Sequence, residues 1–224
     1  MTHLVDIYLQ PGKVFADLKA KPTFLVPLLL MALLSAAMVL LYYGKVDPAW
    51  LTDRTLLAMG DDMGAAELEQ VRKSLPEPQT MGYFGAASVL VATAVMAALY
   101  ALYFMLAGKV TGAAISFRHG LSLTSWAGMP LLLGAIIGLV GVLTMTPQTP
   151  IESLMLANVD PLLVQLPLDH KWSGLAKGFS LLNLWTWFLV ALGWRAWTRS
   201  SWLQAAIVAI VPAVVVYGVM ALLA

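Results

Sequence analysis

Charged residues divide this chain into long apolar stretches and shorter polar connections. Five stretches contain no Asp, Glu, Lys or Arg, namely residues 22–44, 78–108, 119–151, 178–194 and 200–224. A helix needs roughly 20 apolar residues to cross about 30 Å of hydrocarbon, and the fourth stretch supplies them only just. We predict an all-α polytopic membrane protein, a single domain over residues 1–224, in which five transmembrane helices form a bundle with short amphipathic surface helices. The spans are expected at about 24–43, 81–107, 121–146, 175–194 and 202–223.

Composition agrees with this prediction and narrows the possible functions. Apolar residues make up 60% of the chain and charged residues only 11%, which is too few for an ordinary water-facing surface. Ion-coupled transporters and pumps normally place titratable groups at mid-depth in the membrane, and these spans place none there. The chain has no cysteine, which excludes disulfides and thiolate chemistry.

Motifs for catalysis or cofactor binding are missing from the sequence. The three histidines are scattered, without the HExxH spacing of a zinc site. A Gly-rich phosphate loop of the GxxxxGK[ST] type is also missing. We therefore expect no enzymatic activity, no cofactor, no metal and no nucleic-acid partner.

The later spans carry prolines, tryptophans and one strong polar group. Asn183 lies within span four, where an asparagine most often makes an interhelical hydrogen bond of about 1 kcal/mol. Contact with a substrate is the alternative. Prolines in spans three and five free backbone carbonyls and bend helices, which favours a cavity between them. The candidate cavity or bundle-polar positions are Trp126, Pro130, Asn183, Trp185 and Pro212.

The first 23 residues predict a helix at the membrane surface. Val14, Phe15 and Leu18 fall on one helical face, and the lysines lie mostly off it. Such a segment either rests in the headgroup layer, its lysines attracted to anionic lipid, or packs its apolar residues on the bundle. The candidate contacts with a membrane surface or a partner are Lys13, Phe15, Lys19 and Lys21.

Lysines and arginines indicate the orientation. Five spans place the termini on opposite faces, and seven Lys and Arg fall on the face holding residues 1–23, 108–120 and 195–201. Five fall on the longer connections 44–80 and 147–174. The positive-inside rule then predicts a bacterial inner-membrane protein with a cytoplasmic N-terminus and a periplasmic C-terminus.

The outside loop 44–80 is acidic and is expected to form a short amphipathic helix. Asp62 is a candidate N-cap for it. Glu69 precedes Lys73 at the favourable i,i+4 spacing of an ion pair on one helix face. The carboxylates here match no calcium-loop pattern, so we interpret them as a solvated face.

The outside loop 147–174 opens with a capping box formed by Thr149 and Glu152, which predicts a short helix. The apolar run at 161–168 that follows is too short to span a membrane. It either dips into the interface or roofs the bundle, and it becomes the candidate ligand lid if it covers a cavity.

Three short motifs occur in order along nearly the whole chain, namely Pro11-Gly12-Lys13-Val14-Phe15 with Pro22 and Pro27, Phe117-Arg118-His119-Gly120-Leu121-Ser122-Leu123 leading to Trp126 and Pro130, and Leu181-Leu182-Asn183-Leu184-Trp185. In these motifs the chain resembles the Ypt/Rab-interacting protein (YIP) family, in particular its compact bacterial members. The resemblance implies a five-span bundle with a non-enzymatic role in the membrane. For eukaryotic members it also implies membrane trafficking, Rab GTPase contact through a cytosolic N-terminal region, and assembly with other family members.

We do not expect Rab-type GTPase binding here. Only about 23 residues precede the first span, and the sequence has no DLYGP-like or GYS-like segment of the kind associated with those relatives. The leading hypothesis is a membrane scaffold or a partner- or lipid-binding protein. Its partners would be the lipid bilayer, other membrane proteins or a second copy of the chain. The alternative is a small transporter or lipid-binding protein with a cavity among spans three to five, and a packed interior would exclude it.

Overall fold

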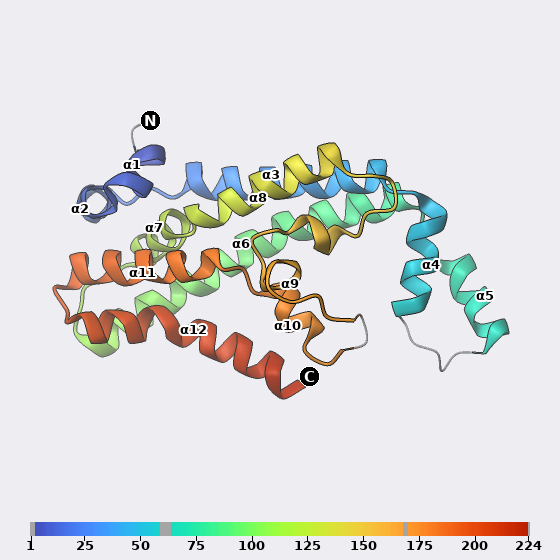
Figure 1. Ribbon diagram of the computed structural model, residues 1–224. Helices are drawn as coiled ribbons and strands as arrows, with labels where there is room; N and C mark the ends of the chain where they lie inside the picture. Colours follow the sequence, from blue (N-terminus) through green and yellow to red (C-terminus); the bar gives the residue numbers. More distant parts are fainter. Residues whose placement is uncertain (1–2, 59–63, 168–169, 224) are drawn as a thin grey trace.

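The computed structural model describes residues 3–58, 64–167 and 170–223, in which the regular elements are helices and the β-pairing is limited to one isolated bridge (Figure 1). The elements in chain order are α1 (His3–Leu9), α2 (Pro11–Ala20), α3 (Leu25–Lys45), α4 (Pro48–Ala58), α5 (Ala65–Ser74), α6 (Pro78–Thr111), α7 (Phe117–Ala127), α8 (Met129–Thr144), the 3-10 helix η1 (Ile151–Leu154), α9 (Val159–Leu162), α10 (Ser173–Gly178), α11 (Leu182–Thr198) and α12 (Trp202–Leu223).

Among the described residues, the three helices α3, α6 and α12 are each long and apolar enough to cross a membrane. The bent pair α7 and α8 passes the same test together and makes a fourth crossing if the two helices form one span. Large apolar side chains on the outer surfaces of these helices are exposed, as on Leu33, Val91 and Val214. A surface of this kind is stable against hydrocarbon and unfavourable in water, so the chain is an all-helical membrane protein.

The first and last predicted spans match α3 and α12 to within two residues at each end. The second is longer than expected, because α6 runs for 34 residues and closes on Gly112, whose φ of 73° provides a left-handed C-cap.

The third predicted span is broken. Instead of one helix over 121–146, α7 and α8 meet at Gly128 with a bend of 43°. The amide of Gly128 donates to the Thr124 carbonyl and closes α7, and Pro130 lies in the first turn of α8. Since proline has no amide hydrogen and fits the first turn of a helix, a new helix begins here.

The fourth predicted span, 175–194, has the wrong boundaries. Helix α10 ends at Gly178, and the 17-residue α11 begins only at Leu182. Between them the chain is extended and pairs with residues 157–159. The Val159 amide donates to the Phe179 carbonyl at 2.9 Å, and the Leu181 amide donates to the Ala157 carbonyl at 2.8 Å. These long-range bonds replace the helical ones across the break.

In the loops that were predicted to lie outside, the expected amphipathic helix is present as α5, and Glu69 pairs with Lys73 at 3.5 Å as expected. The predicted cap, Asp62, lies outside the described residues. The capping box at Thr149 is wrong. Its hydroxyl lies 2.9 Å from that of Thr146, and the turn that follows is the 3-10 helix η1 without a side-chain cap.

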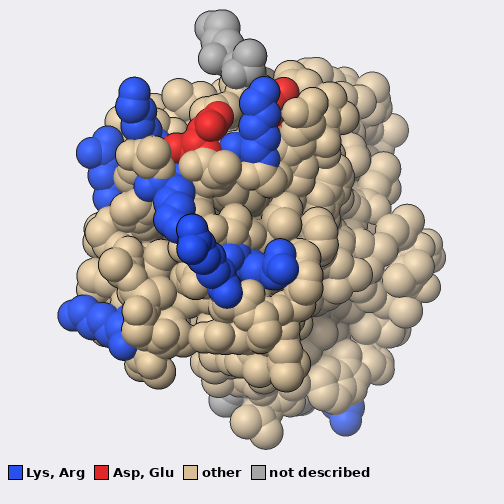
Figure 2. All heavy atoms as spheres, turned by 90° about the vertical axis from the view of Figure 1, so that its left-hand side faces the viewer, with Lys and Arg blue, Asp and Glu red and all other residues tan. Residues whose placement is uncertain are grey.

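The bundle has two ends of different composition. Helices α1 and α2, the connection from α6 to α7 and the turn from α11 to α12 gather at one end, and α4 and α5 lie at the other (Figure 1). Lys and Arg side chains spread over the first end and outnumber Asp and Glu there (Figure 2). We call this surface, which holds Lys13, Lys19, Lys21, Lys109, Arg118, Arg195 and Arg199, the basic end.

Candidate functional site

The N-terminal segment is anchored in the bundle. Ile7, Val14 and Phe15 have no exposed surface, and Leu18 has only 1%. The Trp197 indole Nε1 of α11 donates to the Phe15 carbonyl at 2.6 Å. Of the two expected placements, packing on the bundle is therefore the one observed, and the assignment of Phe15 to a membrane or partner surface is wrong. The apolar face of the N-terminal segment is compatible in polarity with the interior of the bundle as well as with lipid.

The three lysines of this segment are exposed, but they are not equivalent. The Lys19 ammonium donates to the Trp197 carbonyl at 2.6 Å, close to the end of α11. It therefore helps to complete that helix terminus, where carbonyls lack helical partners. Lys13 and Lys21 lie on exposed positions of α2 and its C-cap.

The predicted cavity positions do not come together. Trp126 is buried, and its indole Nε1 donates to the Thr23 carbonyl at 2.8 Å. Pro130 is buried in the first turn of α8. Trp185 is half-exposed, with its ring edge-on to Tyr8. Pro212 lines a separate apolar groove between α6 and α12. Of the five, only Asn183 lines the cavity that we describe next.

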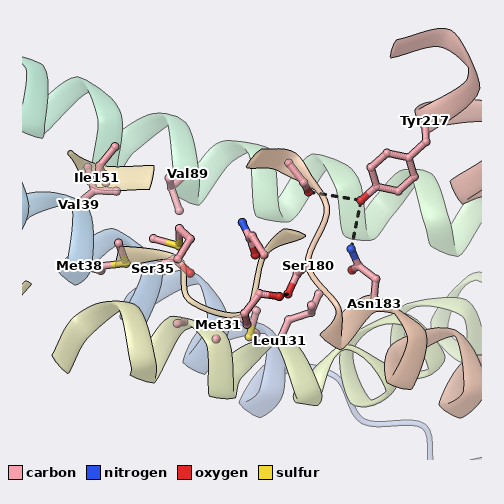
Figure 3. A pocket seen from close by; sticks show the side chains of 16 residues that line it. Met31, Ser35, Met38, Val39, Val89, Leu131, Ile151, Ser180, Asn183 and Tyr217 are labelled. Atoms are coloured by element: carbon pink, nitrogen blue, oxygen red, sulfur yellow. Dashed lines mark hydrogen bonds between the residues drawn. The ribbon is translucent and has the colours of Figure 1, made fainter. Parts of the chain in front are cut away.

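That cavity has a volume of about 400 Å³ and lies between α3, α6, α8, α12 and the two chain segments that precede α11 (Figure 3). We call it the central cavity. Most of its wall is apolar, with Met31, Met38, Val39, Leu131, Ile151 and Met155 as the larger side chains. Methionine side chains are flexible and polarizable, so such a wall adapts to ligands of irregular shape.

One part of the central cavity is polar and uncharged. The Asn183 amide donates to the Tyr217 hydroxyl at 3.1 Å, and that hydroxyl donates to the Gly178 carbonyl at 3.4 Å (Figure 3). Nearby, the Asn158 amide donates to the Lys177 carbonyl at 2.7 Å. The predicted interhelical hydrogen bond of Asn183 is thus observed, and its side chain also faces the cavity.

The chemistry of this wall restricts what the cavity can do. Among the described residues that line it, none is Asp, Glu, Lys, Arg or His. The polar groups of this lining are therefore amides, hydroxyls and backbone groups, which are neutral. The cavity suits an apolar chain that ends near a neutral hydrogen-bonding group.

Sequence reasoning missed most of the wall. Tyr217 could have been found, because a tyrosine hydroxyl in an uncharged span needs a polar partner. Met31, Met38 and Met155 carry no such indication, since a methionine in an apolar stretch is ordinary. The extended segment at 157–158 was expected to be part of a loop, and only long-range pairing brings it to the cavity.

Comparison with known proteins gives one match. The family described as Yip1 domain matches residues 5–223, nearly the whole chain. Curated proteins and solved structures give no match.

Proposed function

Since the chain belongs to the Yip1 family, we propose that it is a non-enzymatic multi-pass protein of the bacterial inner membrane that binds lipid in its central cavity. Five spans are proposed, with α7 and α8 as one bent crossing and the 17 residues of α11 as the shortest. A helix of that length reaches about 25 Å, which is within the range of known crossings.

The observation that carries the proposal is the composition of the central cavity. It combines a methionine-rich apolar wall with a neutral polar group formed by Asn183 and Tyr217. Lipid acyl chains surround a membrane protein at high concentration and match such a wall in polarity. An ion or a water-soluble metabolite would find no charged partner there.

Cross-linking with a phospholipid that carries a photoreactive diazirine in its acyl chain tests the proposal. In liposomes, we expect peptides containing Met31 and Met155 to be labelled, and Ala135→Leu to reduce that labelling because it fills the cavity. The matched control is Ala94→Leu, since Ala94 is exposed on α6 and lines no part of the cavity. Labelling confined to outer surfaces of the bundle, or unchanged by Ala135→Leu, would contradict lipid binding inside it.

A scaffold role at the basic end is the second candidate. Lys13 and Lys21 are exposed there, whereas Phe15 is not available. Other membrane proteins or a second copy of the chain are the proposed partners. We expect Lys13→Gln with Lys21→Gln to reduce the set of membrane proteins that co-purify, without the damage to α11 expected from Lys19→Gln. An unchanged set would exclude these lysines as the contact.

The proposed orientation has a separate test. Reporter fusions after Lys109 and after Pro161 should report cytoplasm and periplasm, respectively. The opposite result at both positions would reverse the topology.

A further inference from the structure

A second pocket adjoins the central cavity, because neighbouring residues of the same segments line the two spaces. It has a volume of about 450 Å³ and is lined by Arg54, Glu152, Asp160 and Lys177 among others, and we call it the charged pocket. Neighbouring residues alternate between the two spaces. Ile151 and Gly178 line the central cavity, whereas Glu152 and Lys177, each one residue away, line the charged pocket.

Arg54, Glu152 and Lys177 form a group with a net positive charge in the charged pocket. The Arg54 guanidinium donates to Glu152 Oε1, and the Lys177 ammonium lies 3.7 Å from the same oxygen. Two cations thus share one carboxylate. Burial by itself would raise the pKa of the Glu152 carboxyl, but hydrogen bonds and the charges of Arg54 and Lys177 outweigh it, so the pKa is lowered. Glu152 therefore stays ionised, and the group carries one excess positive charge.

A second carboxylate, that of Asp160, also lines the charged pocket. Asp160 is only 5% exposed, and its Oδ1 accepts a hydrogen bond from the Leu166 amide at 3.1 Å. No Lys or Arg within residues 3–58, 64–167 and 170–223 forms an ion pair with it. A carboxylate this buried is costly without a positive partner, so the pocket is suited to a ligand that supplies one.

The position of the charged pocket matches the depth of lipid headgroups. Lys177 precedes α11 by only a few residues, and Arg54 comes from α4, beyond the end of the apolar α3. The ends of membrane-spanning helices lie at the headgroup layer, where charged side chains are solvated. Neighbouring residues of the same segments line the uncharged central cavity.

We propose that the charged pocket binds the headgroup of a zwitterionic phospholipid whose acyl chain occupies the central cavity. The phosphate lies against Arg54 and Lys177, and the ammonium group lies against Asp160. This inference rests on the proposed lipid binding and specifies the class of lipid. A phospholipid with an anionic headgroup would satisfy Arg54 and Lys177 but would place no positive charge at Asp160.

The test compares three photoreactive lipids with the same acyl chains, namely phosphatidylethanolamine, phosphatidylglycerol and diacylglycerol, in neutral liposomes. Labelling of the central cavity should be strongest with phosphatidylethanolamine. Asp160→Asn keeps a hydrogen-bond acceptor for the Leu166 amide, and it should reduce the preference for phosphatidylethanolamine over phosphatidylglycerol by about tenfold. Lys177→Gln should weaken labelling by both phospholipids and leave labelling by diacylglycerol unchanged.

Lys171→Gln is the matched control, because Lys171 is an exposed lysine of the same loop that does not line the pocket. If all three lipids label the cavity equally, and if Asp160→Asn and Lys177→Gln leave that labelling unchanged, the headgroup assignment is overturned. The proposed lipid binding in the central cavity would still hold. If none of the three lipids labels the central cavity, the proposed function itself is overturned. If soluble glycerophosphoethanolamine, at the same concentration as the phospholipid, abolishes the labelling, the charged pocket binds a free headgroup. That result would overturn the proposal that the headgroup and the acyl chain in the central cavity belong to one bound lipid.

Discussion

Replacing Phe15 by alanine is expected to release the N-terminal segment from the bundle. The ring has no exposed surface and lies edge-on to the Trp197 ring, with centroids 6.3 Å apart. It also lies over Gly193, where an added Cβ would come within 2.9 Å of it. The Phe15 carbonyl, which accepts the Trp197 hydrogen bond, is kept in the variant. The substitution therefore removes the ring alone.

The magnitude follows from burial. Removing a fully buried phenylalanine ring costs about 3–5 kcal/mol, because the lost contacts are compounded by the cavity that remains. Gly193 has no side chain to fill that cavity. The free energy for opening α1 and α2 away from the bundle should fall by this amount, so the open state should become about a hundredfold more populated, or more.

Gly193→Ala provides an independent check on the same contact. Its Cβ would lie 2.6 Å from Leu123 Cδ1 and 2.9 Å from two carbon atoms of the Phe15 ring, and overpacking of this kind costs about 1–3 kcal/mol. Removing the ring relieves part of that crowding. The double variant should therefore lose less stability than the sum of the two single variants.

Hydrogen exchange of the amides in α2, measured by mass spectrometry in nanodiscs, reports the opening directly. Phe117→Ala is the control, because Phe117 begins α7 and is 41% exposed. The reasoning is refuted if Phe15→Ala exchanges in α2 no faster than the control. It is also refuted if the effects of Phe15→Ala and Gly193→Ala simply add.

Three further predictions concern stability, each measured as the midpoint of thermal unfolding in detergent. Gly120→Ala should be strongly destabilising, because the added Cβ would lie 2.5 Å from the backbone of Ala101, where no side-chain rotation can relieve the clash. An unchanged midpoint would contradict the close crossing of α6 and α7. Trp126→Phe should cost about 1 kcal/mol by removing the bond to the Thr23 carbonyl, and a larger loss would indicate a packing role instead. Glu152 has a pKa lowered from its ordinary value of 4.5, so its contribution is fully present above that pH and is lost as the pH falls below it, through the folded-state pKa. Glu152→Gln should therefore show a smaller decrease in midpoint between pH 7 and pH 4 than the parent, and an equal decrease would contradict the assignment.

The sequence predicts part of the fold closely, for a physical reason. The span that became α3 is apolar between polar flanks, and the apolar span that became α12 follows the polar turn at 199–201, so hydropathy alone locates them. The break before α11 could not be found in this way. It depends on pairing between residues 157–159 and 179–181, and nothing within either segment indicates the other.

The candidate site, like the fold, could be predicted from the sequence only in part. Asn183 was found because an amide in an apolar helix is costly unless it has a partner, so it is conspicuous in the sequence. The rest of the central cavity is formed where several elements leave a space, which no local pattern describes. For Phe15, helical periodicity identified the apolar face correctly, but periodicity does not say whether lipid or protein covers that face.

The motifs that carry the family resemblance meet mainly at one junction, away from the central cavity. Phe15 of the first motif lies over Gly193 of α11, and the ring of His119, from the second motif, donates through Nε2 to the Lys19 carbonyl at 3.1 Å. Asn183 of the third motif is the member that faces the cavity. Helix α11 therefore joins the two regions, because it begins beside the cavity and ends at the junction. It follows that the first two motifs report how the bundle is held together, whereas the proposed lipid contacts gather in the segments before α11, where the central cavity and the charged pocket adjoin.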